Sequence, residues 1–344
     1  TRVQESRLKD LKEDSLAKRV WQDDAALKKV TSYFKRVFGE PLSVYDIGEG
    51  TIGYKISKNS DNEVILLDYW QDHIDNINNN GLTVKGEFDD NIKIQAMKPS
   101  EASKKADLIV VMTKSMYLKD MMEAISHLID ENTQILCLLN GMGHEEILKN
   151  YVNLNQINMG VTIWAAALEE PGSITIRDIG TIDVQNIGGN EEAGKKVADI
   201  LNEGKLNARY DKNVMYAIWR KVMVNGTMNS MTALLECTVG EFFAIDAHER
   251  IIDELVKEFV EVGNADGVNL DKKEMLDYIR ETSKAAKDHY PSMYQDLVER
   301  NRKTEIDFIN GAVVNKGKTH NIATPYNEII TQLVHAKEEL NDAK

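Results

Sequence analysis

The stretch DIGEGTIG at residues 46–53 decides the fold of this chain. Its three glycines have the spacing G-x-G-x-x-G, and they follow an apolar run at 44–47. Glycine at these positions lets the backbone turn and approach a pyrophosphate, while the following helix supplies amide donors and a positive dipole. The pattern therefore predicts a strand, a phosphate-binding loop and a helix, which together begin a dinucleotide-binding domain.

An acidic residue, Asp68, follows the second apolar run at 64–67. An acid about 20 residues beyond a glycine loop accepts hydrogen bonds from ribose hydroxyls, and its charge repels a 2′-phosphate, so Asp68 favours NAD over NADP. Residues 46–51 also resemble the D-x-G-x-G-T loop of S-adenosylmethionine-dependent methyltransferases, in which an acid likewise binds ribose. On the loop alone, both interpretations stay open.

Short apolar runs at 44–47, 64–67, 108–112 and 135–139 alternate with helical stretches. This alternation is typical of strand–helix–strand units around a parallel sheet. The fold class is therefore expected to be α/β.

The pattern changes after this sheet. Two further runs, 174–176 and 182–184, indicate antiparallel strands added at the sheet edge. From about residue 207 the strand patterns stop and helical periodicity continues to the end of the chain. The helices expected there lie at 214–231, 247–262, 272–287, 305–314 and 327–340.

The chain is therefore expected to have three parts. Residues 1–40 carry amphipathic helical spacing and form a helical N-terminal appendage. Residues 41–206 form the dinucleotide-binding domain, and residues 207–344 form an all-helical domain for substrate binding and dimerisation.

Composition limits the partners. Of 344 residues, 42 are basic and 56 acidic, giving a net charge of −14. This charge disfavours binding to nucleic acid and means that a local cluster of donors must hold any anionic substrate.

No apolar run is long enough to span a membrane, and the charged N-terminus predicts a cytoplasmic protein without a signal peptide. Cys137 and Cys237 lie far apart in apolar stretches, so we expect core residues rather than a disulfide, and no metal site.

Three polar residues stand out in the helical part. Lys221, Asn225 and Asn229 are spaced i, i+4, i+8, which places an ammonium and two amides on one stripe of a helix. Further on, Glu305 and Asp307 stand among apolar neighbours, where the pKa of a carboxyl group is sensitive to burial. We interpret both groups as candidate site residues.

From about residue 43 to the C-terminus, the chain resembles the ketopantoate reductase (2-dehydropantoate 2-reductase) family, which includes NAD-dependent D-2-hydroxyacid dehydrogenases. The motifs that carry the resemblance are LLNGMG at 138–143, WRK at 219–221 with Asn225 and Asn229, PSMYQD at 291–296 and TEIDFING at 304–311.

The resemblance implies a Rossmann-like domain, an all-helical C-terminal domain and an active site in the cleft between them. It also implies that Lys221 donates a proton to the keto oxygen as hydride arrives, and that Glu305 holds a substrate hydroxyl. The binding residues implied are Asn225, Asn229, Ser292 and Asn140 for substrate, and Gly48, Gly50, Gly53, Asp68, Lys114 and Asn140 for cofactor.

The expected function is an NAD- or NADP-dependent reduction of a small 2-oxo acid, nominally ketopantoate to D-pantoate, by a homodimer. The alternative within the family is an NAD-dependent D-2-hydroxyacid dehydrogenase acting on branched or aromatic 2-oxo acids. Two alternatives of other classes are a non-catalytic nucleotide-binding sensor, suggested by Glu49 in the loop and the short helix after it, and the methyltransferase.

Overall fold

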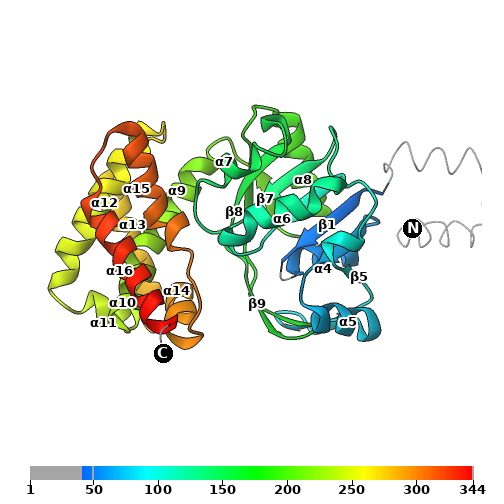
Figure 1. The fold of residues 1–344 in the computed structure, drawn as a ribbon, viewed down its shortest axis with the longest axis horizontal. Helices are drawn as coiled ribbons and strands as arrows, with labels where there is room; N and C mark the ends of the chain where they lie inside the picture. The colour runs from blue at the N-terminus through cyan, green and yellow to red at the C-terminus, as the bar shows by residue number, and fades with distance from the viewer. Residues whose placement is uncertain (1–40, 49, 343–344) are drawn as a thin grey trace, which may run out of the picture. The chain divides into compact units, whose positions relative to one another are not determined.

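The computed structural model describes residues 41–48 and 50–342, which form two compact units (Figure 1). The appendage predicted at 1–40 lies outside the described residues. The first unit comprises residues 41–113, 121–138 and 151–211, and the second comprises 114–120, 139–150 and 212–342.

The first unit is built on an eight-stranded sheet with the order β12-β11-β8-β7-β6-β1-β2-β5. Six neighbouring strands, from β8 to β5, run parallel, and this confirms the predicted α/β class. Their Val-, Ile- and Leu-rich sequences suit a sheet that is buried on both faces. The bounds are β1 (Ser43–Ile47), β2 (Glu63–Leu67), β5 (Gln95–Met97), β6 (Leu108–Val111), β7 (Gln134–Cys137), β8 (Ile157–Thr162), β11 (Ile182–Asn186) and β12 (Ala208–Tyr210).

The prediction of two antiparallel strands at the sheet edge was partly wrong. The run 182–184 forms β11, which pairs antiparallel to β8. It is not the edge strand, because β12 pairs with its other side. The run 174–176 belongs to a separate four-stranded sheet, where it pairs parallel to β3 and antiparallel to β9. That sheet has the order β4-β3-β10-β9 and consists of β3 (Leu82–Gly86), β4 (Asp90–Ile92), β9 (Ala165–Glu170) and β10 (Ser173–Asp178).

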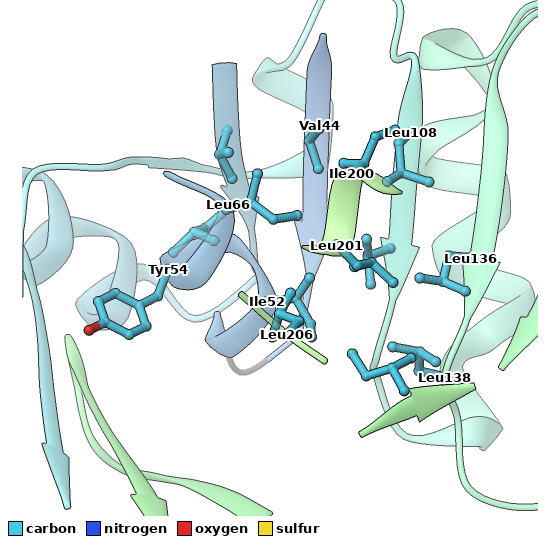
Figure 2. Packing of buried hydrophobic residues seen from close by; sticks show 14 of the residues in the cluster. Val44, Ile52, Tyr54, Leu66, Leu108, Leu136, Leu138, Ile200, Leu201 and Leu206 are labelled. Atoms are coloured by element: carbon cyan, nitrogen blue, oxygen red, sulfur yellow. The ribbon is translucent and has the colours of Figure 1, made fainter. Parts of the chain in front are cut away.

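The core of the first unit lies where the first helix meets the sheet (Figure 2). Ile52 and Tyr54 of α4 and Leu66 of β2 are fully or almost fully buried, together with Leu201 of α8. This packing fixes the start of α4 against the carboxyl ends of β1 and β2. The helical elements before residue 212 are α4 (Thr51–Asn59), α5 (Gln71–Asn80), η1 (Pro99–Glu101), η2 (Ser115–Tyr117), α6 (Leu118–Ile125), η3 (Ser126–Leu128), α7 (His144–Leu148), η4 (Leu154–Gln156) and α8 (Glu191–Glu203).

The second unit contains no strand within its described residues. The expectation that strands stop at about residue 207 missed β12, which follows that residue and pairs parallel to β11 in the first unit. Trp219, Phe242 and Phe259 fill its core. Two wide π-helical turns, η5 and η6, interrupt the α-helical pattern. The elements after residue 212 are α9 (Val214–Val224), η5 (Asn225–Asn229), α10 (Ser230–Leu235), α11 (Val239–Phe243), α12 (Ala247–Ala265), α13 (Lys272–Ala285), α14 (Ser292–Tyr294), η6 (Gln295–Glu299), η7 (Ile306–Phe308), α15 (Asn310–His320) and α16 (Pro325–Asp342).

A buried carboxylate anchors the last helix. Glu258 of α12 accepts the backbone N–H groups of Tyr326 and Asn327, both at 2.9 Å, and the Asn327 side-chain amide at 2.7 Å. These donors lie in the first turn of α16, where backbone N–H groups lack helical acceptors and the helix dipole favours negative charge. Glu258 therefore ties α16 to α12.

Two further sequence expectations concern the cysteines and the membrane. Cys137 is buried, as expected of a core residue, whereas Cys237 is only partly buried, so that expectation was wrong for Cys237. Among the helices in the described part of the chain, none combines the length and the apolar character that a membrane span requires.

Candidate active site

The glycine loop follows β1 and leads into α4. Gly50 precedes the helix in the left-handed region, with φ +86°, which favours glycine. A Cβ at Gly53 would lie 2.5 Å from a methyl carbon of Leu66, so only glycine lets the first helical turn pack this closely on the sheet. These features match the roles that a dinucleotide-binding loop gives to its glycines.

The acid before this loop is part of the loop structure. Asp46 of β1 is buried, and its carboxylate accepts the backbone N–H of Gly53 at 2.6 Å. The Asp46 carboxylate therefore stabilises the turn from strand to helix. It also occupies one of the amide donors at the start of α4.

Asp68 stands at the neighbouring strand end. Because Ile47 of β1 pairs with Leu67 of β2, the glycine loop and Asp68 leave the same edge of the sheet. The Asp68 carboxylate accepts the backbone N–H of Trp70 at 2.8 Å, which fixes its position. The close-packed glycine turn and the adjacent acid are chemically suited to a pyrophosphate and a ribose.

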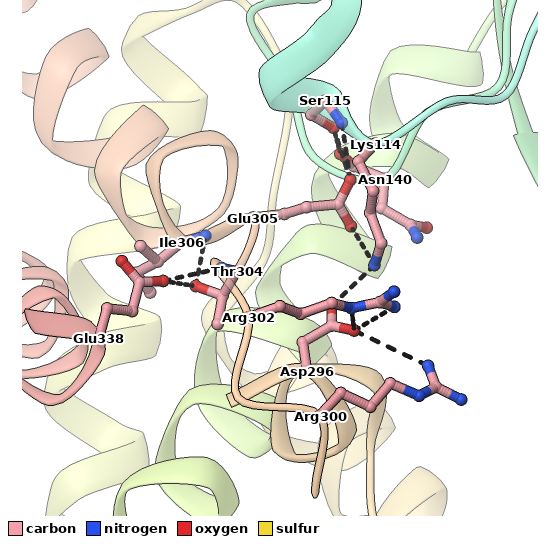
Figure 3. Close-up of polar contacts among 10 residues, drawn as sticks. All are labelled: Lys114, Ser115, Asn140, Asp296, Arg300, Arg302, Thr304, Glu305, Ile306 and Glu338. Atoms are coloured by element: carbon pink, nitrogen blue, oxygen red, sulfur yellow. Dashed lines mark hydrogen bonds and ion pairs between the residues drawn. The ribbon is translucent and has the colours of Figure 1, made fainter. Parts of the chain in front are cut away.

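In the second unit, Glu305 is the centre of a buried polar cluster (Figure 3). The backbone N–H and the hydroxyl group of Ser115 both lie 2.9 Å from one Glu305 oxygen. The same hydroxyl group lies 2.7 Å from the backbone carbonyl of Asn140. Lys114 lies 3.8 Å from the other Glu305 oxygen. Three predicted residues, Lys114, Asn140 and Glu305, are thus brought together, and Ser115 joins them.

A second buried carboxylate, Asp296, lies beside this cluster and forms ion pairs with several basic side chains. Lys114 Nζ is 2.7 Å from one oxygen of Asp296, and Arg302 Nε is 2.7 Å from the other. Arg300 lies 3.9 Å from Asp296. Three cations thus surround Asp296, and one of them, Lys114, also reaches Glu305, as Figure 3 shows. The expected local cluster of positive donors is therefore present, although sequence reasoning identified only Lys114 in it.

Lys221 lies in the last turn of α9 and is partly buried. Burial lowers the pKa of its ammonium group, and the attraction of the Glu305 carboxylate opposes this effect. The two predicted catalytic residues therefore interact electrostatically. A lysine in such surroundings releases a proton more readily than one in water.

The remaining predicted substrate residues carry polar groups that have no partner among the described residues. Asn225 and Asn229 bound the π-helical turn η5, and α14, which begins at Ser292, packs against this turn. Within the described residues, the side chains of Asn140, Asn225, Asn229 and Ser292 make no hydrogen bond to protein. Amides and hydroxyls of this kind are available to a polar ligand.

Sequence reasoning missed the contacts that hold the Asn140 turn. The ring of His144 stacks on Phe308, with centroids 5.1 Å apart and planes within 4°. The Met142 backbone N–H donates to the Phe308 carbonyl at 2.9 Å, and a Cβ at Gly141 would lie 2.5 Å from that carbonyl oxygen. Burial lowers the pKa of His144 to about 4, so its ring is neutral at pH 7. This packing joins the turn to the segment that follows Glu305.

Thr304, which precedes Glu305, is held by α16. Its backbone N–H and hydroxyl group donate to Glu338 at 2.7 and 2.8 Å. His335 bridges Glu338 and Asp307, at 3.2 and 2.9 Å. Burial lowers the pKa of His335, but its hydrogen bonds to the two carboxylates outweigh this effect and leave the pKa raised. Helical spacing alone does not predict this network, because it joins His335 and Glu338 of α16 to Thr304 and Asp307, which lie about 30 residues earlier in the chain.

A glycine loop on a parallel sheet, together with a helical unit that places a lysine near a buried carboxylate, defines the class of dinucleotide-dependent oxidoreductases. Comparison with known proteins identifies the family. Residues 48–189 match the family "Ketopantoate reductase PanE/ApbA", and residues 213–338 match "Ketopantoate reductase PanE/ApbA C terminal". The chain therefore belongs to the ketopantoate reductase family, a family of nicotinamide-dependent oxidoreductases, and the resemblance found in the sequence is confirmed.

Individual relatives agree with this assignment. A 2-dehydropantoate 2-reductase from Streptococcus pyogenes serotype M1 is 51% identical over 302 residues, covering 86% of this chain and 98% of the relative. One from Lactococcus lactis is 44% identical over 290 residues, covering 82% and 93%. The ternary structure of D-mandelate dehydrogenase with NADH and anilino(oxo)acetate is 37% identical, with a TM-score of 0.82, and covers 88% of this chain and 100% of that one. These relatives are oxidoreductases, which argues against the methyltransferase and sensor alternatives.

Proposed function

We propose that this protein reduces 2-dehydropantoate to D-pantoate with a nicotinamide dinucleotide. The observation that carries the proposal is the 51% identity to a 2-dehydropantoate 2-reductase across 98% of that protein's length. The cations around Asp296 and the amides on η5, which have no partner in the described part of the chain, support it, because the substrate carries a carboxylate, a ketone and a hydroxyl group.

Lys221 acts as the proton donor in this proposal. Its ammonium group hydrogen-bonds the keto oxygen and transfers a proton to that oxygen as the carbonyl carbon is reduced. Burial of Lys221 makes the proton easier to release, and the Glu305 carboxylate keeps the ammonium charged before the reaction. The bound nicotinamide supplies the hydride for the carbonyl carbon.

The substrate's other groups are assigned to the neighbouring polar residues. Glu305 orients the substrate hydroxyl, and its own orientation is set by the two donors of Ser115. Asn225, Asn229 and Ser292 bind the hydroxyl and carboxylate groups. In the same proposal Asn140 contacts both cofactor and substrate.

Lys114 neutralises the substrate carboxylate or a cofactor phosphate. Its ammonium group already lies between Asp296 and Glu305, where Arg300 and Arg302 add further positive charge. An anion next to this cluster gains attraction that the acidic protein as a whole does not offer.

The second candidate is an NAD-dependent D-2-hydroxyacid dehydrogenase for branched or aromatic 2-oxo acids. The observation that favours it is the likeness to D-mandelate dehydrogenase, whose structure contains NADH. Asp68 supports NAD in either candidate, because its carboxylate next to the ribose would repel a 2′-phosphate.

One set of assays separates the candidates. Oxidation of NADH and of NADPH is followed with ketopantoate, 2-oxoisovalerate and phenylglyoxylate. The highest kcat/KM with ketopantoate supports the first candidate, and the highest kcat/KM with 2-oxoisovalerate or phenylglyoxylate supports the second. No oxidation with any pair refutes both.

The cofactor assignment has its own test. Asp68→Ser should raise kcat/KM with NADPH relative to NADH, because the repulsion of the 2′-phosphate is removed. Asp199→Ser, which changes an exposed acid on α8, is the matched control. An unchanged ratio for Asp68→Ser would remove Asp68 from cofactor selection.

A homodimer is also proposed. Ile329, Leu333 and Leu340 of α16 are exposed, although large aliphatic side chains usually lie inside a protein or an interface. Light scattering should give twice the chain mass, and Leu333→Glu should lower it to the monomer value. A monomeric wild type would refute the proposal.

A further inference from the structure

The turn between two of the proposed substrate residues is wider than an α-helical turn. Asn225 and Asn229 bound η5, and the backbone N–H of Ser230 bonds the carbonyl of Asn225, five residues earlier. In an α-helix the same N–H would reach the carbonyl of Gly226, four residues earlier. The wide turn holds one extra residue, which rotates the following chain by about 100° relative to an uninterrupted α-helix. The direction of Asn229 relative to Asn225 therefore depends on this turn.

Two side-chain donors bind the Gly226 carbonyl inside this turn. The hydroxyl group of Ser230 donates to it at 2.6 Å, and the side-chain amide of Asn310, from α15, donates to it at 3.0 Å. Both side chains are buried. A Cβ at Gly226 would lie 2.5 Å from a ring carbon of Phe259 and 3.2 Å from the Asn310 amide nitrogen, so glycine lets the turn approach both. Because a buried carbonyl without a donor lowers stability, these two donors stabilise the wide turn.

A buried carboxylate sets the orientation of the Asn310 amide. Glu258 accepts the side-chain amide nitrogen of Asn327 at 2.7 Å. An ionised carboxylate only accepts hydrogen bonds, so Asn327 turns its nitrogen toward Glu258 and its oxygen toward Asn310. The Asn310 nitrogen donates to that oxygen at 2.9 Å and to the Gly226 carbonyl. An inverted Asn310 amide would place its oxygen against two acceptors, so the direction of this chain of hydrogen bonds is fixed from Glu258 to the turn.

The oxygen of the Asn310 amide indicates that the residue does more than fill space. It is buried and has no hydrogen-bond partner among the residues that the structure describes. A buried oxygen without a donor lowers stability, and an apolar side chain of similar shape would fill the same volume without that penalty. What Asn310 contributes is therefore its pair of N–H donors, one of which reaches the turn.

We propose that Asn310 is a positioning residue of the active site: by holding the Gly226 carbonyl it keeps η5 in the wide form that aims its two asparagines at the substrate. This inference rests on the proposed function, because the roles of Asn225 and Asn229 come from there. The hydrogen bond from Asn310 goes to the backbone of the turn, so the residue acts through these asparagines rather than on the substrate.

The test replaces the amide by an apolar group of similar shape. Asn310→Leu removes both N–H donors, and KM is measured with the 2-oxo acid that the wild type reduces best. We expect KM to rise about tenfold, the scale of one hydrogen bond lost between substrate and protein. The value of kcat should change little, because this binding is lost equally in the ground state and the transition state. The Kd values of NADH and NADPH should stay the same, because η5 contains none of the residues assigned to the cofactor.

Two further variants support the same test. Ser230→Ala removes the other side-chain donor to the carbonyl and should raise KM about two- to tenfold, and it replaces Asn310→Leu if that variant does not fold. In an Asn229→Ala background, Asn310→Leu should raise KM much less than in the wild type, because the amide that the turn aims is gone.

A variant elsewhere in the same unit controls for a loss of stability alone. Ile279 is buried in α13, which packs against α11 and α12. Ile279→Ala should therefore lower the urea concentration at the midpoint of unfolding but leave KM unchanged.

The outcomes that overturn the inference are distinguishable from failure of the proposed function. A wild-type KM in Asn310→Leu, or in Ser230→Ala where the first variant does not fold, would refute the positioning role and leave the proposed function intact. An equal rise in KM with and without Asn229 would do the same. A wild type that reduces no 2-oxo acid with NADH or NADPH would refute the proposed function and this inference together.

Discussion

The hydroxyl group of Ser115 offers a quantitative test of how the site is held together. It is buried and carries one hydrogen, yet two acceptors lie within bonding distance, the Asn140 carbonyl at 2.7 Å and the Glu305 carboxylate at 2.9 Å. Ser115→Ala removes this hydrogen but keeps the backbone N–H bond to Glu305. Glu305 then has one donor in place of two, and its side chain gains freedom to rotate.

The size of the effect follows from hydrogen-bond energetics. A bond to a charged acceptor contributes about 1.5–3 kcal/mol and a bond to a neutral carbonyl about 0.5–1.5 kcal/mol. Because one hydrogen serves both acceptors, we expect a loss of about 1.5–3 kcal/mol in the free energy of unfolding. If the same energy is lost from the orientation of Glu305 in the transition state, kcat/KM falls about 10- to 100-fold, since about 1.4 kcal/mol is a factor of ten.

Urea unfolding and steady-state reduction of ketopantoate measure the two effects. Ser126→Ala is the matched control, because its exposed hydroxyl donates to the Glu123 carbonyl at 2.9 Å, and we expect a change within about 0.5 kcal/mol. If Ser115→Ala unfolds at the same urea concentration as the wild type and keeps its kcat/KM, the positioning role of Ser115 is wrong.

Three further predictions address other parts of the second unit. Lys221→Ala should lower kcat by about 10² to 10⁴, the usual scale for loss of a general acid, and an unchanged kcat would remove Lys221 from the mechanism. Glu258→Gln should lower the free energy of unfolding by about 2–4 kcal/mol in urea titrations, because an amide offers one acceptor oxygen to donors that need two; a smaller loss than about 1 kcal/mol would contradict this. Since the pKa of His335 is raised in the folded state, its pairing with Asp307 and Glu338 stabilises fully below about pH 6.5, its unfolded pKa, and this contribution is lost as pH rises through the folded pKa. The difference in unfolding free energy between wild type and His335→Gln should therefore be larger at pH 6 than at pH 9, and a pH-independent difference would refute this role.

The main sheet could be predicted because each of its central strands is a short, continuous apolar run in the sequence. Apolar runs such as 108–111 are buried on both faces and bounded by polar segments, so the sequence predicts that they are strands of a parallel sheet, although it does not predict their order in that sheet. The sequence does not predict which strands pair with each other. The runs 174–176 and 182–184 have similar patterns, yet they enter different sheets, and periodicity contains no information on which neighbour a strand selects.

Candidate site residues could be selected from the sequence where polar side chains recur at helical spacing on one stretch of chain. Lys221, Asn225 and Asn229 were found from their helical spacing, although the turn between the two asparagines is π-helical rather than α-helical. Ser115 was missed because its bond to Glu305 joins residues 190 positions apart. Arg302 was missed because its role depends on Asp296 being buried, which composition around it does not reveal.

The second unit is built from three separate segments of the chain, and this affects how relatives can be recombined. Ser115 and Asn140 precede residue 207, whereas Glu305 and Asp296 follow it, yet all four belong to the same compact unit. A crossover at the apparent domain boundary would combine the donors of one parent with the carboxylates of another. Chimeras that join two relatives at this boundary are therefore expected to contain residues of the site from both parents. Only a chimera that takes residues 114–120 and 139–150 from the same parent as the C-terminal segment would contain a complete site from one parent.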